Sequence, residues 1–215
     1  MIILRHYKVD DVSYVSQKDI LRVLQRGLKR AKIDVKYSQG FIPHMLTYTS
    51  TPVPLGVQSL AEYFAVECSG IDKDEFLKRY NASMPVGMRA VESFYKDKNP
   101  NIAAIVTASD YRVKSSQSLS KEIEKIAESQ SYFIDVNKKG EVIEKDIAPM
   151  VYALKVEDDT LCMRLATGNT NLRCDDVVRH INGKFGCDIK INDIFRTAQL
   201  VGDKRSFRDV EEVLR

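Results

Sequence analysis

The order of strand-like and helix-like segments constrains this chain more than any other feature of its sequence. In residues 1–97 the spacing of apolar residues changes along the chain. It alternates between the two-residue spacing of a half-buried strand and the three- to four-residue spacing of an amphipathic helix. We therefore expect the order strand, helix, strand, strand, helix, strand in this part of the chain. The expected strands cover residues 2–9, 45–51, 59–68 and 86–95, and the expected helices cover residues 16–32 and 73–81.

Residues 98–215 repeat this order with one extra hairpin, because two hairpins are expected there. One consists of strands 132–136 and 141–145 around a polar turn at 137–140, and the other of strands 151–156 and 161–166 across residues 157–159. The order predicts an α+β fold of two tandem ferredoxin-like (βαββαβ) halves, residues 1–97 and 98–215. Each half is expected to have an antiparallel sheet with helices on one face. The other elements expected in the second half are strands at 102–113, 151–156, 161–166 and 189–200, and helices that begin at Ser118 or Ser120, at Asp175 or Asp176, and near Phe207.

The expected helix at 16–32 has an apolar face and a cationic face. Ser16 is suited to cap its N-terminus, and leucines recur at the spacing of one buried stripe. No acidic residue lies between Ile20 and Ile33, so like charges stand side by side at a cost of roughly a few tenths of a kcal/mol per pair. A cationic stripe is commonly a solvated surface, but it also suits phosphate or RNA. Its members are Lys18, Arg22, Arg26, Lys29 and Arg30.

The segment at 37–44 gathers two aromatic rings, an amide, a hydroxyl and an imidazole. Gly40 permits a positive φ or a close backbone approach, and Pro43 favours extended geometry at Ile42. This composition suits a ligand-binding loop and equally suits a turn that plugs a core. A histidine without a partner in the nearby sequence is more often structural than catalytic. The candidate binding residues in this loop are Tyr37, Ser38, Gln39, Gly40, Phe41 and His44.

Composition excludes several kinds of site. The four cysteines form no C-x-x-C pair, so the sequence has no zinc or iron–sulfur signature, and we expect no metal and no cofactor. The net charge of +3 is too small to indicate nucleic-acid binding by itself. The first residues do not resemble a signal peptide, and no apolar run approaches the length of a membrane span. We therefore expect a cytoplasmic protein that does not bind a membrane.

Several stretches carry a resemblance to a known family: SQGF-x-PH within residues 22–44, PLGVQSLAEY at 54–63, and, more loosely, GNTNLRCDDVVRHI at 168–181 with Arg196–Thr197. On these residues the chain resembles the radical SAM-linked protein family, a bacterial domain of unknown function found beside or fused to an uncharacterised radical SAM protein. The resemblance implies an RNA-related setting and a radical SAM partner. The family commonly has His where this chain has Gln17, which argues against a proton-transfer or metal role there.

The function that we expect is a non-enzymatic module that binds RNA or a partner and serves a radical SAM enzyme. The helix cations would contact phosphates, and Tyr37 and Phe41 would stack on bases, at ~1–3 kcal/mol each. The chain lacks the cysteine cluster motif that radical chemistry requires, so it is not the radical enzyme. A second basic cluster that would extend the binding surface consists of Arg164, Arg173, Arg179 and Arg196.

Three alternatives remain open from the sequence. One is an endoribonuclease-like enzyme with a histidine base, for which His6 and His44 are the candidates. Another is a small anionic-ligand site in which Arg22 clamps a carboxylate or phosphate. The third is a scaffold that docks to the radical SAM protein through an apolar surface. We expect Glu62 to face solvent or to pair with an arginine of the first helix rather than to act in catalysis.

Overall fold

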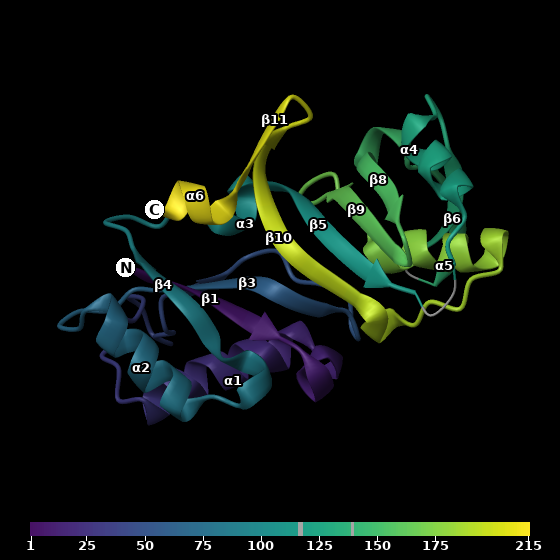
Figure 1. Ribbon diagram of the computed structural model, residues 1–215. Coiled ribbons are helices and arrows are strands. Elements are labelled where there is room, and N and C mark those ends of the chain that lie inside the picture. Colours follow the sequence, from purple (N-terminus) through teal and green to yellow (C-terminus); the bar gives the residue numbers. More distant parts are fainter. Residues whose placement is uncertain (116–117, 139) are drawn as a thin grey trace.

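The computed structural model describes residues 1–115, 118–138 and 140–215. The chain is a mixed α+β protein, which confirms the predicted class. One nine-stranded sheet runs through the described chain, and a separate two-stranded sheet lies at one end of the molecule (Figure 1). The helices pack on the faces of the large sheet.

The first part of the large sheet comes from residues 1–97. Its elements are β1 (Ile2–Lys8), α1 (Gln17–Arg30), β2 (Thr47–Thr49), β3 (Gln58–Val66), α2 (Lys73–Ser83) and β4 (Ala90–Tyr95). The strand order is β4-β1-β3-β2, and every neighbouring pair is antiparallel. Polar caps start both helices: the Ser16 hydroxyl accepts a backbone N–H in α1, and the Asp72 carboxylate accepts two in α2.

The second part of the large sheet comes from the remaining residues. Its elements are α3 (Ile102–Ile105), β5 (Val106–Lys114), α4 (Lys125–Glu128), β6 (Phe133–Lys138), β7 (Glu141–Asp146), β8 (Val151–Glu157), β9 (Thr160–Ala166), α5 (Cys174–Phe185), β10 (Ile194–Asp203), β11 (Ser206–Asp209) and α6 (Val210–Leu214). The strand order is β10-β5-β9-β8, antiparallel throughout, and β11 pairs with β10. Both predicted hairpins form: the first is the separate β6–β7 sheet, and the second is β8–β9 in the large sheet. Lys139, in the expected turn of the first, lies outside the described residues.

The two parts join through a parallel pairing of β3 with β10. Phe195 lies opposite Gln58, and Arg196 lies opposite Ser59. This pairing is possible because the short β2 covers only the far end of β3, which leaves the first residues of β3 available to β10. Two tandem halves with separate antiparallel sheets are therefore not confirmed, since the sheet is continuous and mixed.

Apolar side chains cover both faces of the first part of the sheet. One buried cluster joins β1 and β3 to α1 and α2, and includes Leu4, Leu24, Leu28, Phe64 and Phe76. A second cluster joins the opposite face to α3 and α6, and includes Ile3, Tyr63, Phe94, Ile102 and Val210. Successive residues of β1 are both apolar, so both faces need cover (Figure 1). The two helices of residues 1–97, α1 and α2, lie on one face as expected, and α3 and α6 from the rest of the chain cover the other face. In the second part, α5 packs over a third cluster.

Several predicted elements differ from the structure near their ends. The strand expected from residue 86 opens with a 3₁₀ turn at Val86–Met88, and the strand expected from residue 189 is preceded by one at Ile191–Asp193. The strand expected from residue 102 opens with helix α3, and the expected C-terminal helix is divided between β11 and α6. Hydrophobic periodicity does not separate such turns and short elements from the first residues of a strand or helix.

Candidate functional site

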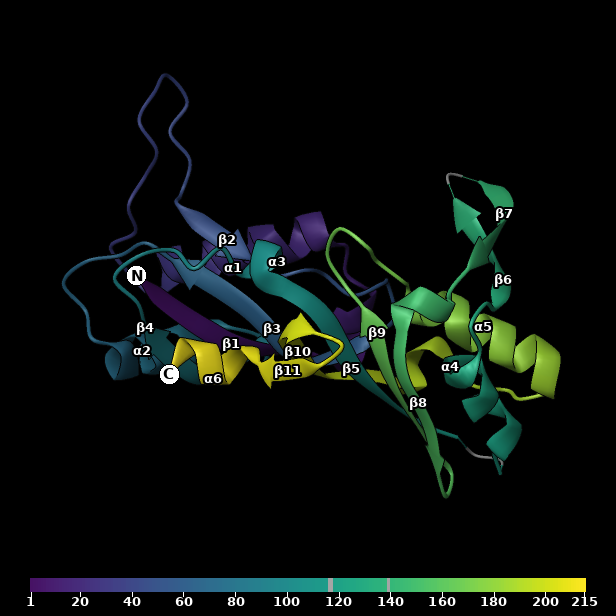
Figure 2. The ribbon, with the colours of Figure 1, turned by 90° about the horizontal axis from the view of Figure 1, so that it is seen from above.

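The cationic face of α1 and the segment that follows it enclose a groove of about 300 Å³. Figure 2 shows that this segment, between α1 and β2, stands away from the body of the molecule as a long hairpin. Backbone bonds between its two arms, such as Ser38 N–H to the His44 carbonyl at 2.9 Å, hold the arms together. The structure thus brings helix and loop candidates together. The groove is lined by Arg22, Gln25, Arg26, Lys29, Tyr37, Pro43, His44 and Met45.

The cations of α1 differ in their partners. Arg22 bridges Asp19 at 2.7 Å, but both side chains are about half exposed, so the pair adds little stability. Arg30 donates two hydrogen bonds to the Ser83 carbonyl at 2.8 and 3.2 Å, which directs it toward the end of α2 and away from the groove. Among the described residues, Arg26 and Lys29 have no carboxylate partner. These two cations are available to an anion in the groove.

Lys18 is exposed at the start of α1 and does not line the groove. Its charge helps to lower the pKa of Asp19, after the larger effects of the Ser16 hydroxyl and of Arg22. Lys18 therefore stands apart from the candidate site.

The imidazole of His44 has a partner that its sequence neighbours did not reveal. Ser38 Oγ lies 2.8 Å from His44 Nδ1 and also accepts the backbone N–H of His44 at 3.1 Å. The two residues face each other across the hairpin, so the ring is fixed at the groove wall. Tyr37, on the same wall, keeps 45% of its surface exposed.

The tip of the hairpin lies outside the groove. Gln39 and Gly40 are exposed, Phe41 is fully exposed and Ile42 is 83% exposed. None of these four lines the groove. Phe41, which we expect to stack on a base beside the helix cations, is therefore outside the groove that Arg22, Arg26 and Lys29 line.

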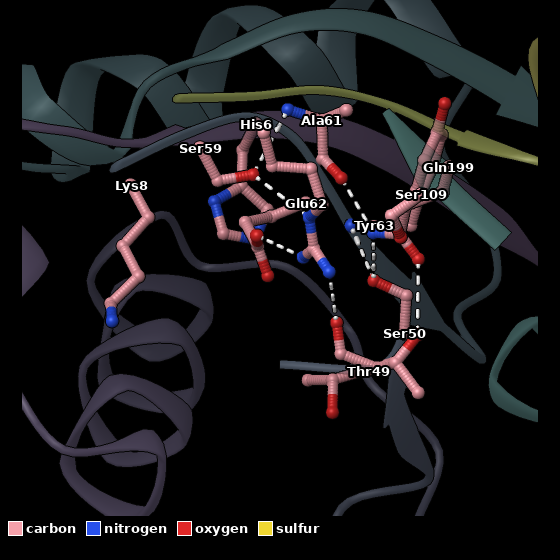
Figure 3. Close-up of polar contacts among 12 residues, drawn as sticks. His6, Lys8, Thr49, Ser50, Ser59, Ala61, Glu62, Tyr63, Ser109 and Gln199 are labelled. Carbon is pink, nitrogen blue, oxygen red and sulfur yellow. Dashed lines mark hydrogen bonds and ion pairs between the residues drawn. The ribbon is translucent and has the colours of Figure 1, made fainter. Parts of the chain in front are cut away.

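Arg196 is not a surface ligand. It is fully buried, and its guanidinium makes an ion pair with Glu62 and donates to the Thr51 carbonyl at 2.8 Å and to Ser59 Oγ at 3.3 Å. Pairing of β10 with β3 carries it into the sheet interior. Glu62 is buried as well, so it neither faces solvent nor pairs with α1 (Figure 3).

Other polar groups surround this ion pair. His6 lies opposite Glu62 in the β1–β3 register and is 2% exposed. Burial lowers the pKa of His6, although the charge of Glu62 partly opposes this. Lys8 is also buried, and its amine donates to the Ser13 carbonyl at 3.0 Å. Because His6 is enclosed, it cannot act as a base on RNA at the surface, and that candidacy is wrong.

The predicted second basic cluster is neutralised. Arg164 binds Asp110 with two bonds of 2.7 and 2.8 Å. Arg173 binds Asp175 with two bonds of 2.7 and 3.0 Å, and Arg179 binds the neighbouring Asp176 at 2.8 Å. Together with the buried Arg196, these pairs leave no free cationic surface in this cluster, so the predicted extension of the binding surface is wrong.

Gln17, at the position where the resemblance leads us to expect His, approaches Thr49 Oγ1 at 3.5 Å. It therefore contacts β2 from α1 and has a structural place. Burial raises the pKa of Cys174 to about 12, so this thiol stays protonated. Within residues 1–115, 118–138 and 140–215, no group of three or more His, Cys, Asp or Glu side chains is arranged to hold a metal ion. In the same ranges, no helix has the length and apolar character needed to cross a membrane.

The signal for the buried ion pair was present in the sequence. Glu62 and Arg196 each interrupt a largely apolar strand. A buried charge needs a partner of opposite charge, so two such strands are candidates to lie side by side.

Comparison with known proteins gives one family. No curated protein matches the chain. A family model described as "Uncharacterized protein conserved in bacteria (DUF2344)" matches residues 2–174, which is most of the chain. The match includes α1, the hairpin and the groove between them. The chain therefore belongs to this bacterial DUF2344 family.

Proposed function

We propose that this protein is a non-catalytic module that binds RNA in the groove between α1 and the hairpin. The observation that carries the proposal is the pair of cations, Arg26 and Lys29, which face Tyr37 and lack a carboxylate partner among the described residues. Phosphates supply the missing negative charge, and release of their counterions drives association.

The electrostatics of α1 support a polyanion. Arg22, Arg26 and Lys29 follow one another at helical spacing, so each repels the next. Of these three cations, Arg22 alone pairs with a carboxylate among the described residues. A bound phosphate backbone relieves this repulsion, and an aromatic ring beside it adds stacking with bases. A purely solvated charged face would need no aromatic wall.

The fold gives weaker support, by analogy. We propose that each part of the sheet, residues 1–97 and residues 98–215, is a ferredoxin-like module. The strand orders are β4-β1-β3-β2 and β10-β5-β9-β8. In both orders, the strand that comes first in the chain lies between the third and the fourth strands of the large sheet in that part. Tandem ferredoxin-like modules bind RNA in other families, but a fold alone does not establish a function.

The proposed partner is a radical SAM protein, and its support is the resemblance carried by residues 22–44 and 54–63. The measurement is purification of the tagged protein from its native host, followed by identification of bound polypeptides by mass spectrometry. Recovery of a radical SAM protein in stoichiometric amount supports the proposal. Its absence from purifications that retain RNA would contradict the partnership.

RNA binding is tested by fluorescence anisotropy with labelled RNA over a range of salt concentrations. We expect affinity to fall steeply with salt. The variant Arg26→Glu/Lys29→Glu should lose at least tenfold in affinity and reduce the salt slope by about two, one for each lost phosphate contact. The matched control is Lys73→Glu/Lys78→Glu on α2, which changes the net charge equally outside the groove. Absent binding, salt-independent binding or an equal loss in the control contradicts the proposal.

A second candidate is an endoribonuclease that uses His44. The observation in its favour is the contact between His44 and Ser38 at the wall of a cationic groove, because a fixed imidazole near phosphates is what a general base requires. The test compares cleavage of RNA by the wild type and by His44→Ala. Equal cleavage by the two, or no cleavage by either, excludes this function.

A further inference from the structure

Building on the proposed function, we infer that the groove takes an unpaired nucleotide of single-stranded RNA and excludes duplex RNA. The base stacks on Tyr37, and Arg26 and Lys29 hold the adjoining phosphates. Phe41, at the tip of the hairpin, is a second stacking surface further along the same strand. The substrate class is therefore RNA with consecutive unpaired bases.

The size of the groove limits what enters it. Its volume of about 300 Å³ is at the lower end of the range for pockets that hold small molecules. Modules that recognise duplex RNA instead lay an open surface across roughly 16 base pairs. Here α1 forms one wall and the hairpin forms the other. The gap between these walls is wide enough for a single strand, and a double helix is excluded because it would collide with their edges.

The two walls carry different chemistry. The α1 wall is cationic, through Arg26 and Lys29, and the hairpin wall presents the exposed ring of Tyr37. Bases inside a duplex are already stacked on both faces, so an aromatic ring gains a partner only from an unpaired base. An arrangement with phosphates on one wall and a ring on the other therefore matches an unpaired nucleotide.

Two polar side chains in the groove are held in place by their neighbours. The Gln25 amide nitrogen donates to Thr47 Oγ1 at 3.0 Å, and His44 is held by Ser38 at 2.8 Å. In the described part of the chain, Gln25 Oε1 and His44 Nε2 have no hydrogen-bond partner. These fixed groups are placed to contact the edge of a base that lies on Tyr37.

The hairpin tip packs on nothing in the described chain. A side-chain carbon added at Gly40 would meet no atom within 4 Å, and Gly40 has a φ of +128°. Phe41 and Ile42 are largely exposed beside this turn and do not line the groove. A fully exposed ring without an intramolecular partner, on the arm that carries Tyr37, suits a second unpaired base.

The experiment compares three probes by anisotropy: labelled decauridine, a labelled RNA duplex of equal length, and inorganic polyphosphate as an unlabelled competitor without bases. We expect decauridine to bind at least tenfold more tightly than the duplex. Tyr37→Ala should weaken decauridine binding roughly tenfold, as expected for one lost stack, and leave competition by polyphosphate unchanged. Tyr37→Phe is the control and should keep the wild-type affinity. Phe41→Ala should cost several-fold in decauridine affinity.

The outcomes separate this inference from the proposed function. Equal affinity for duplex and decauridine, or an unchanged affinity in Tyr37→Ala, overturns the inference while RNA binding by the cations stands. An unchanged affinity in Phe41→Ala overturns the second stacking position. If no probe binds, or if Arg26→Glu/Lys29→Glu binds all three as well as the wild type does, the proposed function itself fails.

Discussion

Arg26 and Arg196 are the same residue type in two regions with opposite surroundings. Arg26 is exposed on α1, without a carboxylate partner in the described chain, at the wall of a groove. Arg196 is fully buried and bound to Glu62, Thr51 and Ser59. The difference shows that burial and bonded partners decide whether an arginine contributes to binding or to folding. The residue type alone does not reveal either of these properties.

The arginines of the second part of the sheet lie between these extremes. Arg164 is partly exposed, but two bonds to Asp110 occupy its guanidinium, which also lies 5.4 Å from the ring centre of Phe207. Such a pair is neither buried enough to be essential nor free enough to bind a phosphate. We therefore expect the loss of stability on substitution to be largest for the Arg196 pair, smaller for the Arg164 pair and smallest for the groove cations. RNA affinity should fall on substitution of the groove cations and stay unchanged on substitution of Arg164.

The largest expected effect on stability is at the buried ion pair. Glu62→Ala leaves the Arg196 charge unpaired in the interior and should lower the free energy of unfolding by about 3–5 kcal/mol. The measurement is urea denaturation followed by circular dichroism. The double variant Glu62→Leu/Arg196→Met removes both charges and should be more stable than Glu62→Ala. A Glu62→Ala protein as stable as wild type would show that this pair does not hold the two parts together.

Arg26 is the exposed site to compare with the buried pair of Glu62 and Arg196. Arg26→Met should leave the denaturation midpoint unchanged, because no described residue depends on this side chain for a hydrogen bond or ion pair. A midpoint shift similar to that of the buried pair would contradict the distinction between the two regions.

The next effect is a pH dependence from His6, which shares the buried cluster. Burial lowers the folded-state pKa of His6 below its ordinary value of about 6.5, so the unfolded chain binds this proton more tightly. Above pH 6.5 the ring is neutral in both states, and protonation costs the folded protein no stability. As the pH falls through 6.5, the unfolded chain takes up the proton first, so the free energy of unfolding falls by up to about 1.4 kcal/mol per pH unit. Denaturation at neutral and mildly acidic pH should show this fall, and His6→Asn should show a shallower one. An equal fall in the variant would assign the effect to other groups.

A smaller effect is expected at Arg164. Because its pair with Asp110 is partly exposed, Arg164→Ala should cost roughly 0.2–1 kcal/mol of unfolding free energy. RNA affinity should stay at the wild-type value in anisotropy measurements. A loss of RNA affinity comparable with that of groove variants would restore the second part of the sheet as a binding surface.

Much of the fold was predictable because its signals are local. The leucine stripe and the Ser16 cap predicted α1, and short apolar segments bounded by turns predicted β1 and β3, each to within a residue or two. The β3–β10 pairing was not predictable in the same way. It joins residues far apart in the chain, and its only sequence signal is one charge in each of two apolar strands, Glu62 and Arg196.

The candidate site was predictable in part. Helical spacing placed Arg22, Arg26 and Lys29 on one face, and the groove brings them to Tyr37 and His44. The position of Phe41 depends on the length of the hairpin arms, which cannot be predicted from the composition of the segment. The pairing of Arg179 with Asp176 has the i,i+3 spacing of a helix, which the sequence alone could have indicated. Arg173 precedes α5 and reaches Asp175 two residues further on, which helical spacing does not indicate.

The central claim is that unpaired cations on α1, and not arginines in general, bind RNA. Its most direct test compares Arg26→Gln/Lys29→Gln with Arg164→Gln/Arg179→Gln, two variants that lose the same charge, by anisotropy with decauridine at low salt. The account predicts at least a tenfold loss of affinity for the first and wild-type affinity for the second. Equal losses would mean that net charge alone governs binding, and an unchanged affinity in the first would remove the groove from the account.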